Sequence, residues 1–146
     1  MKQTAMAALL ATLPAGAFAD VAVTDAWARA SILASRPGAA YLSLTSDTGD
    51  RLLSATTPVA GHVMIHAAQT DAKGVARMTH LEVLDLAPGQ TVTFAPGGMH
   101  LMLMGLGAGF DEGTHFPLTL TFETAGAVTV EVPVLGVAAT GPEGGQ

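Results

Sequence analysis

Residues 118–132 read Leu-Thr-Leu-Thr-Phe-Glu-Thr-Ala-Gly-Ala-Val-Thr-Val-Glu-Val, so apolar and polar side chains alternate in two runs. A period of two is typical of β-strands that bury one face. The Thr-Ala-Gly-Ala segment at residues 124–127 separates the runs, and its glycine favours a turn. This stretch therefore predicts two consecutive strands.

Short runs rich in Val, Leu, Thr and Phe recur along the rest of the chain between Gly and Pro residues. About nine strands of four to eight residues are typical of a sandwich or barrel. We expect an all-β domain over residues 20–135, followed by a flexible tail over residues 136–146 that lacks an apolar period. The expected strands are Val21–Thr24, Ala39–Leu44, Leu52–Ala55, His62–His66, Ala76–Val83, Thr91–Phe94, His100–Gly105, Pro117–Glu123 and Val128–Val134.

Residues 1–19 have the features of a secretory signal peptide. Lys2 supplies a positive charge, an apolar run follows from Ala5 to Leu13, and Ala17-Phe18-Ala19 is an A-x-A cleavage site. The apolar run is well short of the ~20 residues that a membrane-spanning helix needs. We therefore expect cleavage before Asp20 and a periplasmic protein without a membrane anchor.

The charge and the missing cysteines exclude several functions. Beyond the leader, five basic side chains stand against twelve acidic ones, a net charge of −7 that argues against nucleic acid as a partner. The absence of cysteine excludes a cysteine nucleophile and the His₂Cys set of a blue-copper electron carrier. No serine lies in a Gly-x-Ser-x-Gly elbow. We expect a binding protein and not an enzyme.

Histidine and methionine are concentrated between His62 and Met104, which hold four of the five histidines and every methionine beyond the leader. Thioether sulfur is a soft ligand and imidazole a borderline one, a combination that suits Cu(I) and disfavours Mg²⁺, Ca²⁺ and Mn²⁺. Zinc prefers cysteine, histidine or carboxylate. The residues in this stretch are His62, Met64, His66, Met78, His80, Met99, His100, Met102 and Met104.

The most specific element of the stretch is His100-Leu101-Met102. In a strand, the imidazole and the thioether two residues apart point to the same face, and Met104 continues on that face. The turn-like Ala95-Pro96-Gly97-Gly98 segment is expected to deliver His100 to the start of this strand.

A hairpin is expected around Asp71-Ala72-Lys73-Gly74, because this segment is turn-like. Directly opposed side chains in such a hairpin have Cβ atoms about 4.5–5.5 Å apart, within reach of one metal ion. If the hairpin is centred on Ala72, the opposed pairs are His66 with Met78 and Met64 with His80.

On these residues the chain resembles the PCu(A)C family of periplasmic copper chaperones (DUF461). The most specific segment is Pro96–Leu106, which reads Pro-Gly-Gly-Met-His-Leu-Met-Leu-Met-Gly-Leu. The family's copper motif is His, ten residues, Met, twenty-one residues, His-x-Met. Met78, His100 and Met102 match its second part, whereas eleven residues separate His66 from Met78. The other resembling segments are Asp25–Arg29, Ala39–Leu42, Asp50–Leu52 and Pro117–Phe122.

The resemblance implies a cupredoxin-like, Ig-like antiparallel β-sandwich that binds Cu(I) through His66, Met78, His100 and Met102. It also implies delivery of copper to the dinuclear CuA site of cytochrome c oxidase. A cysteine-free carrier cannot reduce a disulfide, so we expect it to work beside a Sco-type thiol reductant, as a monomer. The alternatives are copper storage or scavenging, and a β-sandwich binding module without metal.

The other histidines and methionines have simpler interpretations. Methionine commonly fills cores, and we expect this of Met64, Met99 and Met104. The remaining histidines are expected to be ordinary surface or loop residues, and Trp27 and Tyr41 structural anchors. These histidines are His62, His80 and His115.

Overall fold

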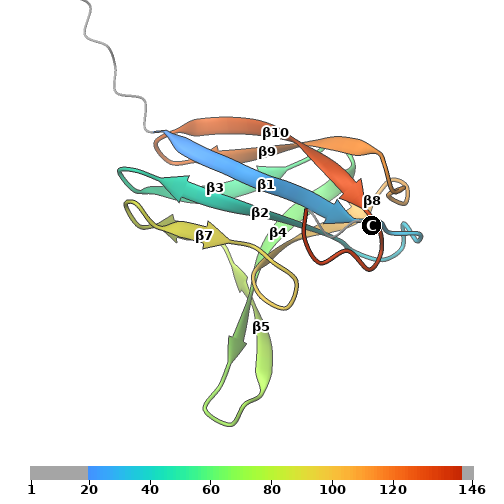
Figure 1. The fold of residues 1–146 in the computed structure, drawn as a ribbon, viewed down its shortest axis with the longest axis horizontal. Coiled ribbons are helices and arrows are strands. Elements are labelled where there is room, and N and C mark those ends of the chain that lie inside the picture. The colour runs from blue at the N-terminus through green and yellow to red at the C-terminus, as the bar shows by residue number, and fades with distance from the viewer. Residues whose placement is uncertain (1–19, 143–146) are drawn as a thin grey trace, which may run out of the picture.

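The protein is described over residues 20–142 by a computed structural model. Within this range it forms ten β-strands and no helix (Figure 1), which confirms the predicted all-β class. The described part therefore holds no helix that could cross a membrane. The predicted signal peptide, residues 1–19, lies outside the described residues. The strands are β1 (Val21–Arg29), β2 (Gly38–Ser46), β3 (Asp50–Thr56), β4 (Ala60–Thr70), β5 (Ala76–Leu81), β6 (Leu84–Leu86), β7 (Thr91–Thr93), β8 (His100–Leu106), β9 (His115–Phe122) and β10 (Gly126–Leu135).

The strands form two layers around one core. The first layer has the order β5-β4-β8-β2-β1, with β7 also paired to β2, and the second has the order β10-β9-β3-β6. The layers are joined where β1 and β10 pair in parallel, whereas the other described strand pairs are antiparallel. The sheet is therefore mixed at this seam.

The alternating stretch at the end of the domain forms the hairpin of β9 and β10, as predicted. Leu118, Leu120 and Phe122 are buried, whereas the threonines between them are only half-buried. Gly126 begins β10 with a φ of 75°, a left-handed conformation that glycine adopts without strain. The buried side chains of β9 face those of the first layer in the shared core.

The predicted strand over residues 76–83 is wrong at its end. The chain bends at Glu82, and β6 begins at Leu84 in the second layer, beside β3. The β6–β3 pair is accompanied by an ion pair of Arg51 Nε with Asp85 Oδ1 at 2.8 Å. A three-residue strand is too short to show a period, so the sequence did not separate β6 from β5.

Two contacts involve strand β1, one with β2 and one with the segment after β10. Trp27 and Tyr41 are buried, as expected, with ring centroids 4.5 Å apart.

Beyond β10, the segment predicted as a flexible tail approaches the sandwich. Ala139 is 4% exposed, and its carbonyl accepts a hydrogen bond of 2.8 Å from Arg29 Nε. Residues 143–146 lie outside the described residues.

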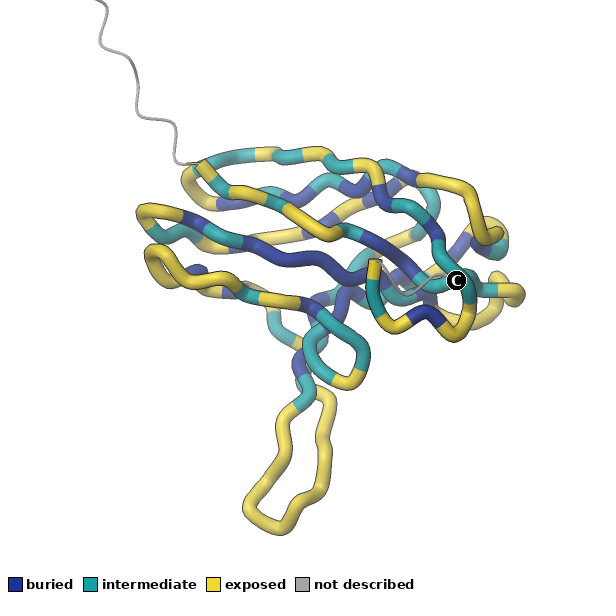
Figure 2. The backbone as a smooth tube through the Cα atoms, in the orientation of Figure 1, coloured by how far each residue is buried: buried dark blue, intermediate teal, exposed yellow. Residues whose placement is uncertain are grey.

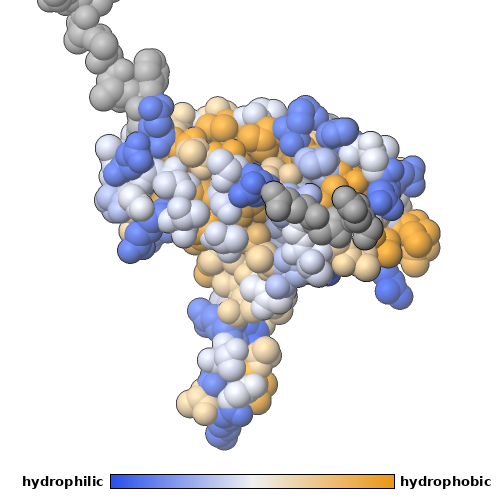
Figure 3. All heavy atoms as spheres, in the orientation of Figure 1, coloured by the Kyte–Doolittle hydropathy of each residue, from blue (hydrophilic) through white to orange (hydrophobic). Residues whose placement is uncertain are grey.

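The outer part of β4 and the whole of β5 project from the sandwich as a hairpin (Figure 1). Every residue from Gln69 to Met78 is exposed, and Figure 2 shows this arm as a continuous exposed segment. In Figure 3 hydrophilic and hydrophobic residues are interspersed over both the body and the hairpin. The inner part of β4 lies between β5 and β8 and contributes Ile65 to the core.

We predict that Leu101→Ala lowers the free energy of unfolding by about 2–5 kcal/mol, because truncating a buried leucine loses apolar contacts and leaves a cavity. Leu101 is 0% exposed on the core side of β8. Urea unfolding measures the effect, and Leu53→Ala, at a side chain that is 41% exposed, is the control. Equal losses in the two variants would contradict this account of the core.

Candidate metal centre

The hairpin of β4 and β5 turns through a three-residue loop. The Asp71 carbonyl accepts a hydrogen bond from Gly74 N at 3.0 Å, and Asp71 N donates to the Val75 carbonyl at 3.0 Å. The Asp71 carboxylate accepts further bonds from Lys73 N and Val75 N. Gly74 has a φ of 77°, the left-handed residue that follows a type I turn in hairpins of this length.

This loop centres the hairpin on Lys73, so the register predicted around Ala72 is wrong. His66 lies opposite His80, and Met78 lies opposite Ala68. Because the centre of the hairpin moves by one residue, from Ala72 to Lys73, each pairing partner on β5 moves by two positions.

A second turn places β8. Gly98 N donates to the Ala95 carbonyl at 3.0 Å, with Pro96 and Gly97 between them and a Gly97 φ of 84°. Proline followed by a left-handed glycine is the signature of a type II turn. The chain then enters β8 at His100, as predicted.

Strands β4 and β8 pair so that their soft ligands face each other. His66 lies opposite His100, Met64 opposite Met102, and His62 opposite Met104. Opposed residues share a face, as do residues two apart on one strand. The intervening Ile65 and Leu101 are buried in the core, so this ladder lies on the outward face of the sheet.

Three histidines form one row across β5, β4 and β8. The rings of His66 and His80 have centroids 5.9 Å apart, and those of His66 and His100 are 5.3 Å apart at a near-perpendicular angle of 70°. His100 is 8% exposed, and its Nδ1 lies 3.4 Å from the Gly98 carbonyl. A carbonyl can only accept, so this contact favours the tautomer that leaves Nε2 free for a metal.

His66 is the central imidazole, and its environment disfavours a proton. Burial lowers its pKa below the usual 6.5, and the neighbouring His100 and His80 lower it further. Its Nδ1 is buried without a hydrogen-bond partner. A neutral imidazole with an unsatisfied nitrogen is the form that binds metal.

Of the four predicted ligands, the structure puts His66, His100 and Met102 on adjacent positions of one face. Met78 lies on the same face by register, one row beyond the histidines toward the hairpin tip, and is 58% exposed. Among the described residues, no three histidine or carboxylate side chains form a metal-binding group.

His80 and Met64 share this face with the predicted ligands, although no site role was predicted for either residue. Met64 is two positions from His66 on β4, so the sequence already indicated that these two side chains share a face. Which residues of β5 and β8 lie beside them depends on the pairing between strands, which the sequence does not show. Met99 packs against the core, as expected, whereas the same expectation is wrong for Met64 and Met104, which lie half-buried on the outward face. His115 is exposed on β9.

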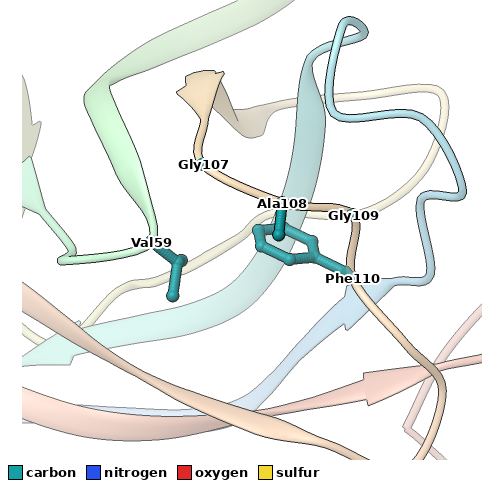
Figure 4. Close-up of a pocket in the computed structure, with 5 residues that line it drawn as sticks. All are labelled: Val59, Gly107, Ala108, Gly109 and Phe110. Carbon is teal, nitrogen blue, oxygen red and sulfur yellow. The ribbon is translucent and has the colours of Figure 1, made fainter.

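A separate hollow of about 260 Å³ lies at the far end of the β4–β8 ladder. It is lined by Val59 and the segment from Gly107 to Phe110, and Figure 4 shows the Val59 and Phe110 side chains at its wall. None of these side chains can ligate a metal, so the hollow is not part of the soft-ligand face.

The fold is that of the PCuAC domains, which confirms the predicted resemblance and the cupredoxin-like fold. The apo PCuAC domain of PmoF2 superposes with a TM-score of 0.70 at 26% identity, covering 83% of this chain and 94% of that domain. The copper-bound PCuAC domain of PmoF2 gives 0.66 at 27% identity, covering 78% and 91%. The solution structure of CuI-DR1885 from Deinococcus radiodurans gives 0.60 at 32% identity, covering 82% of each chain.

The chain belongs to the LpqE-like family, whose description is "Putative lipoprotein LpqE-like" and which matches residues 21–134. A relative described as "Putative lipoprotein Lxx21020", from Leifsonia xyli subsp. xyli (strain CTCB07), is 29% identical over 114 residues. The aligned part is 78% of this chain and 69% of that protein.

We predict that the metal-free protein loses stability as the pH falls below about 6.5. Because the pKa of His66 is lowered on folding, the unfolded chain binds more protons in this range, and protonation favours unfolding. Denaturant unfolding between pH 8 and pH 5 measures the loss, which should be smaller in His66→Gln. The control is His115→Gln on β9, and a loss that is equal in His66→Gln and the parent would contradict the assignment.

Proposed function

We propose that this chain is a periplasmic Cu(I) chaperone that supplies copper to cytochrome c oxidase, acting by transfer and not by catalysis. The observation that carries the proposal is the pairing of His66 with His100 beside Met102 on one outward face. Neutral imidazole and thioether donors suit Cu(I). The proposal is supported by similarity to a domain described as copper-bound and to a protein described in its CuI form.

We infer that the ligands are His66, Met78, His100 and Met102, the set that the family pattern assigns. The unsatisfied Nδ1 of His66 fits this role, because a metal would give that buried nitrogen a partner. Met78 is the outer donor of the set, since it stands on the exposed hairpin one row beyond the histidines.

The arrangement suits a carrier that must also release its ion. Cu(I) has a filled d shell and little geometric preference, so its ligands can exchange one at a time with those of an acceptor. Neutral donors leave the positive charge uncompensated, which makes release easier than from thiolates. The hairpin projects away from the body (Figure 2), so an acceptor can approach Met78 and His80 without displacing the core.

The proposed acceptor is the copper-site subunit of cytochrome c oxidase, whose CuA site lies outside the membrane. The leader-like residues 1–19 and the relatives described as lipoproteins support export to the same side. The chain has no cysteine with which to reduce a disulfide in the acceptor. A Sco-type protein is therefore the proposed reducing partner.

We predict that Met102→Leu weakens Cu(I) binding by at least about tenfold, since even outer partners of metal ligands contribute about 10–100-fold. Leucine keeps the volume, so the free energy of unfolding should change by less than about 1.5 kcal/mol. Anaerobic titration against bicinchoninate measures affinity, with an expected stoichiometry of one ion per chain. Met104→Leu, on the same face, is the matched control.

A parent protein that binds no Cu(I) in this titration would rule out the proposed function. If the parent binds but Met102→Leu binds equally tightly, then Met102 only packs on the sheet and the ligand set is wrong. Met78→Leu should weaken binding in the same direction as Met102→Leu.

In the cell, deletion of the gene should lower cytochrome oxidase activity in copper-poor medium, and added copper should restore it. Activity that is normal at every copper concentration would instead favour copper storage or the metal-free binding module. A Met102→Leu allele tested beside a Met104→Leu allele separates loss of copper binding from loss of the protein.

A further inference from the structure

Two neighbouring rungs of the β4–β8 ladder carry four soft donors. His66 faces His100 on one rung, and Met64 faces Met102 on the next. Opposed Cβ atoms in an antiparallel pair are about 4.5–5.5 Å apart, and positions two apart along a strand are separated by about 7 Å. The four side chains therefore rise from the corners of one small rectangle.

The core lies beneath the rectangle, and strand β2 lies along one side of it. Beneath it lie Ile65 and Leu101, which are 4% and 0% exposed and belong to the core. Beside Met102, strand β2 contributes Ala39, whose side chain is a single methyl group. Met64, like Met102, is half-buried, so its thioether is neither enclosed by the core nor free in solvent.

Met78 is a diagonal neighbour of His66, about 7–8 Å away, but it stands further from His100 and Met102 than Met64 does. It pairs with Ala68, which is four positions along β4 from Met64, or about 13 Å at 3.3 Å per residue. It also lies on β5, separated from β8 by the whole of β4. Met102 and Met64 are opposed directly, whereas Met102 and Met78 are separated along both directions of the sheet.

We propose that Met64 is a Cu(I) ligand, which gives this chain an inner copper position formed by His66, His100, Met64 and Met102. This inference rests on the proposed function and adds a donor that the family pattern does not contain. The ion lies over the rectangle in the resting protein. Met78, the outer donor of the ligand set proposed above, coordinates the ion at an outer position on the hairpin, which the ion reaches when it moves toward an acceptor.

The first test is Cu(I) affinity in three variants of the purified protein, measured anaerobically against bicinchoninate. Met64→Leu should weaken binding by at least about tenfold and by more than Met78→Leu does. Met104→Leu is the matched control, because Met104 is also half-buried on the outward face and opposes a histidine. Its affinity should equal that of the parent.

The second test needs no substitution in the protein that is measured, so it does not depend on how a variant folds. The parent is labelled with ¹³C in its methionine methyl groups, and each signal is assigned by the leucine variant that lacks it. An equimolar amount of Cu(I) should shift the methyl signals of Met64 and Met102 and leave that of Met104 in place.

The outcomes separate the inference from the proposed function. If the parent binds Cu(I) and Met102→Leu is impaired, but Met64→Leu stays within about threefold of the parent and the Met64 methyl does not shift, the inner position is refuted and the chaperone stands. A parent that binds no Cu(I) overturns both. Weaker binding by Met64→Leu together with a shifted Met64 methyl supports the inner position.

Discussion

The register of β4 against its two neighbours is the constraint on which the site depends. Side chains on a strand alternate between faces, so a slip of one residue would exchange every outward residue for an inward one. The observed pairings put His66 beside His80 on one edge and beside His100 on the other. A slip of β8 by one position would direct its histidine and methionines into the core and Leu101 and Leu103 into solvent. The cost of exposing the fully buried Leu101 and Leu103 is what fixes the register.

Two glycines determine which residues meet within that constraint. Gly74 lengthens the hairpin turn by one left-handed residue, and Gly97 completes the turn before β8. The turn at Gly74 sets the register in which Met78 opposes Ala68. The turn at Gly97 reverses the chain so that β8 begins at His100. The donors are thus placed by backbone turns that contain no donor, and a change in loop length alone alters which ligands are adjacent.

Much of the fold could be predicted from sequence because strand periodicity is a local property. The alternation in residues 118–132 gave the β9–β10 hairpin, and His100-x-Met102 gave two donors on one face. Pairing between strands is not local, and so the partner of His66 on β5 was predicted wrongly. The neighbours of Met64 and His80 were predicted wrongly for the same reason, since Met64 pairs with Met102 and His80 with His66. Strand β6 was not predicted as a separate strand, because three residues are too few to show a period.

Strand β8 carries the side chains that pack the core on one face and the possible metal ligands on the other. Leu101 and Leu103 are fully buried, whereas His100, Met102 and Met104 lie on the outward face of the same strand. Donor chemistry can therefore change without rebuilding the core. Replacing thioethers by carboxylates on the outward face would turn a soft site into a hard one, suited to oxygen-seeking cations. In a sandwich of this kind, the outward residues that set metal preference can change by evolution or by design. The buried residues that stabilise the fold lie on the opposite face of the same strands and can stay the same.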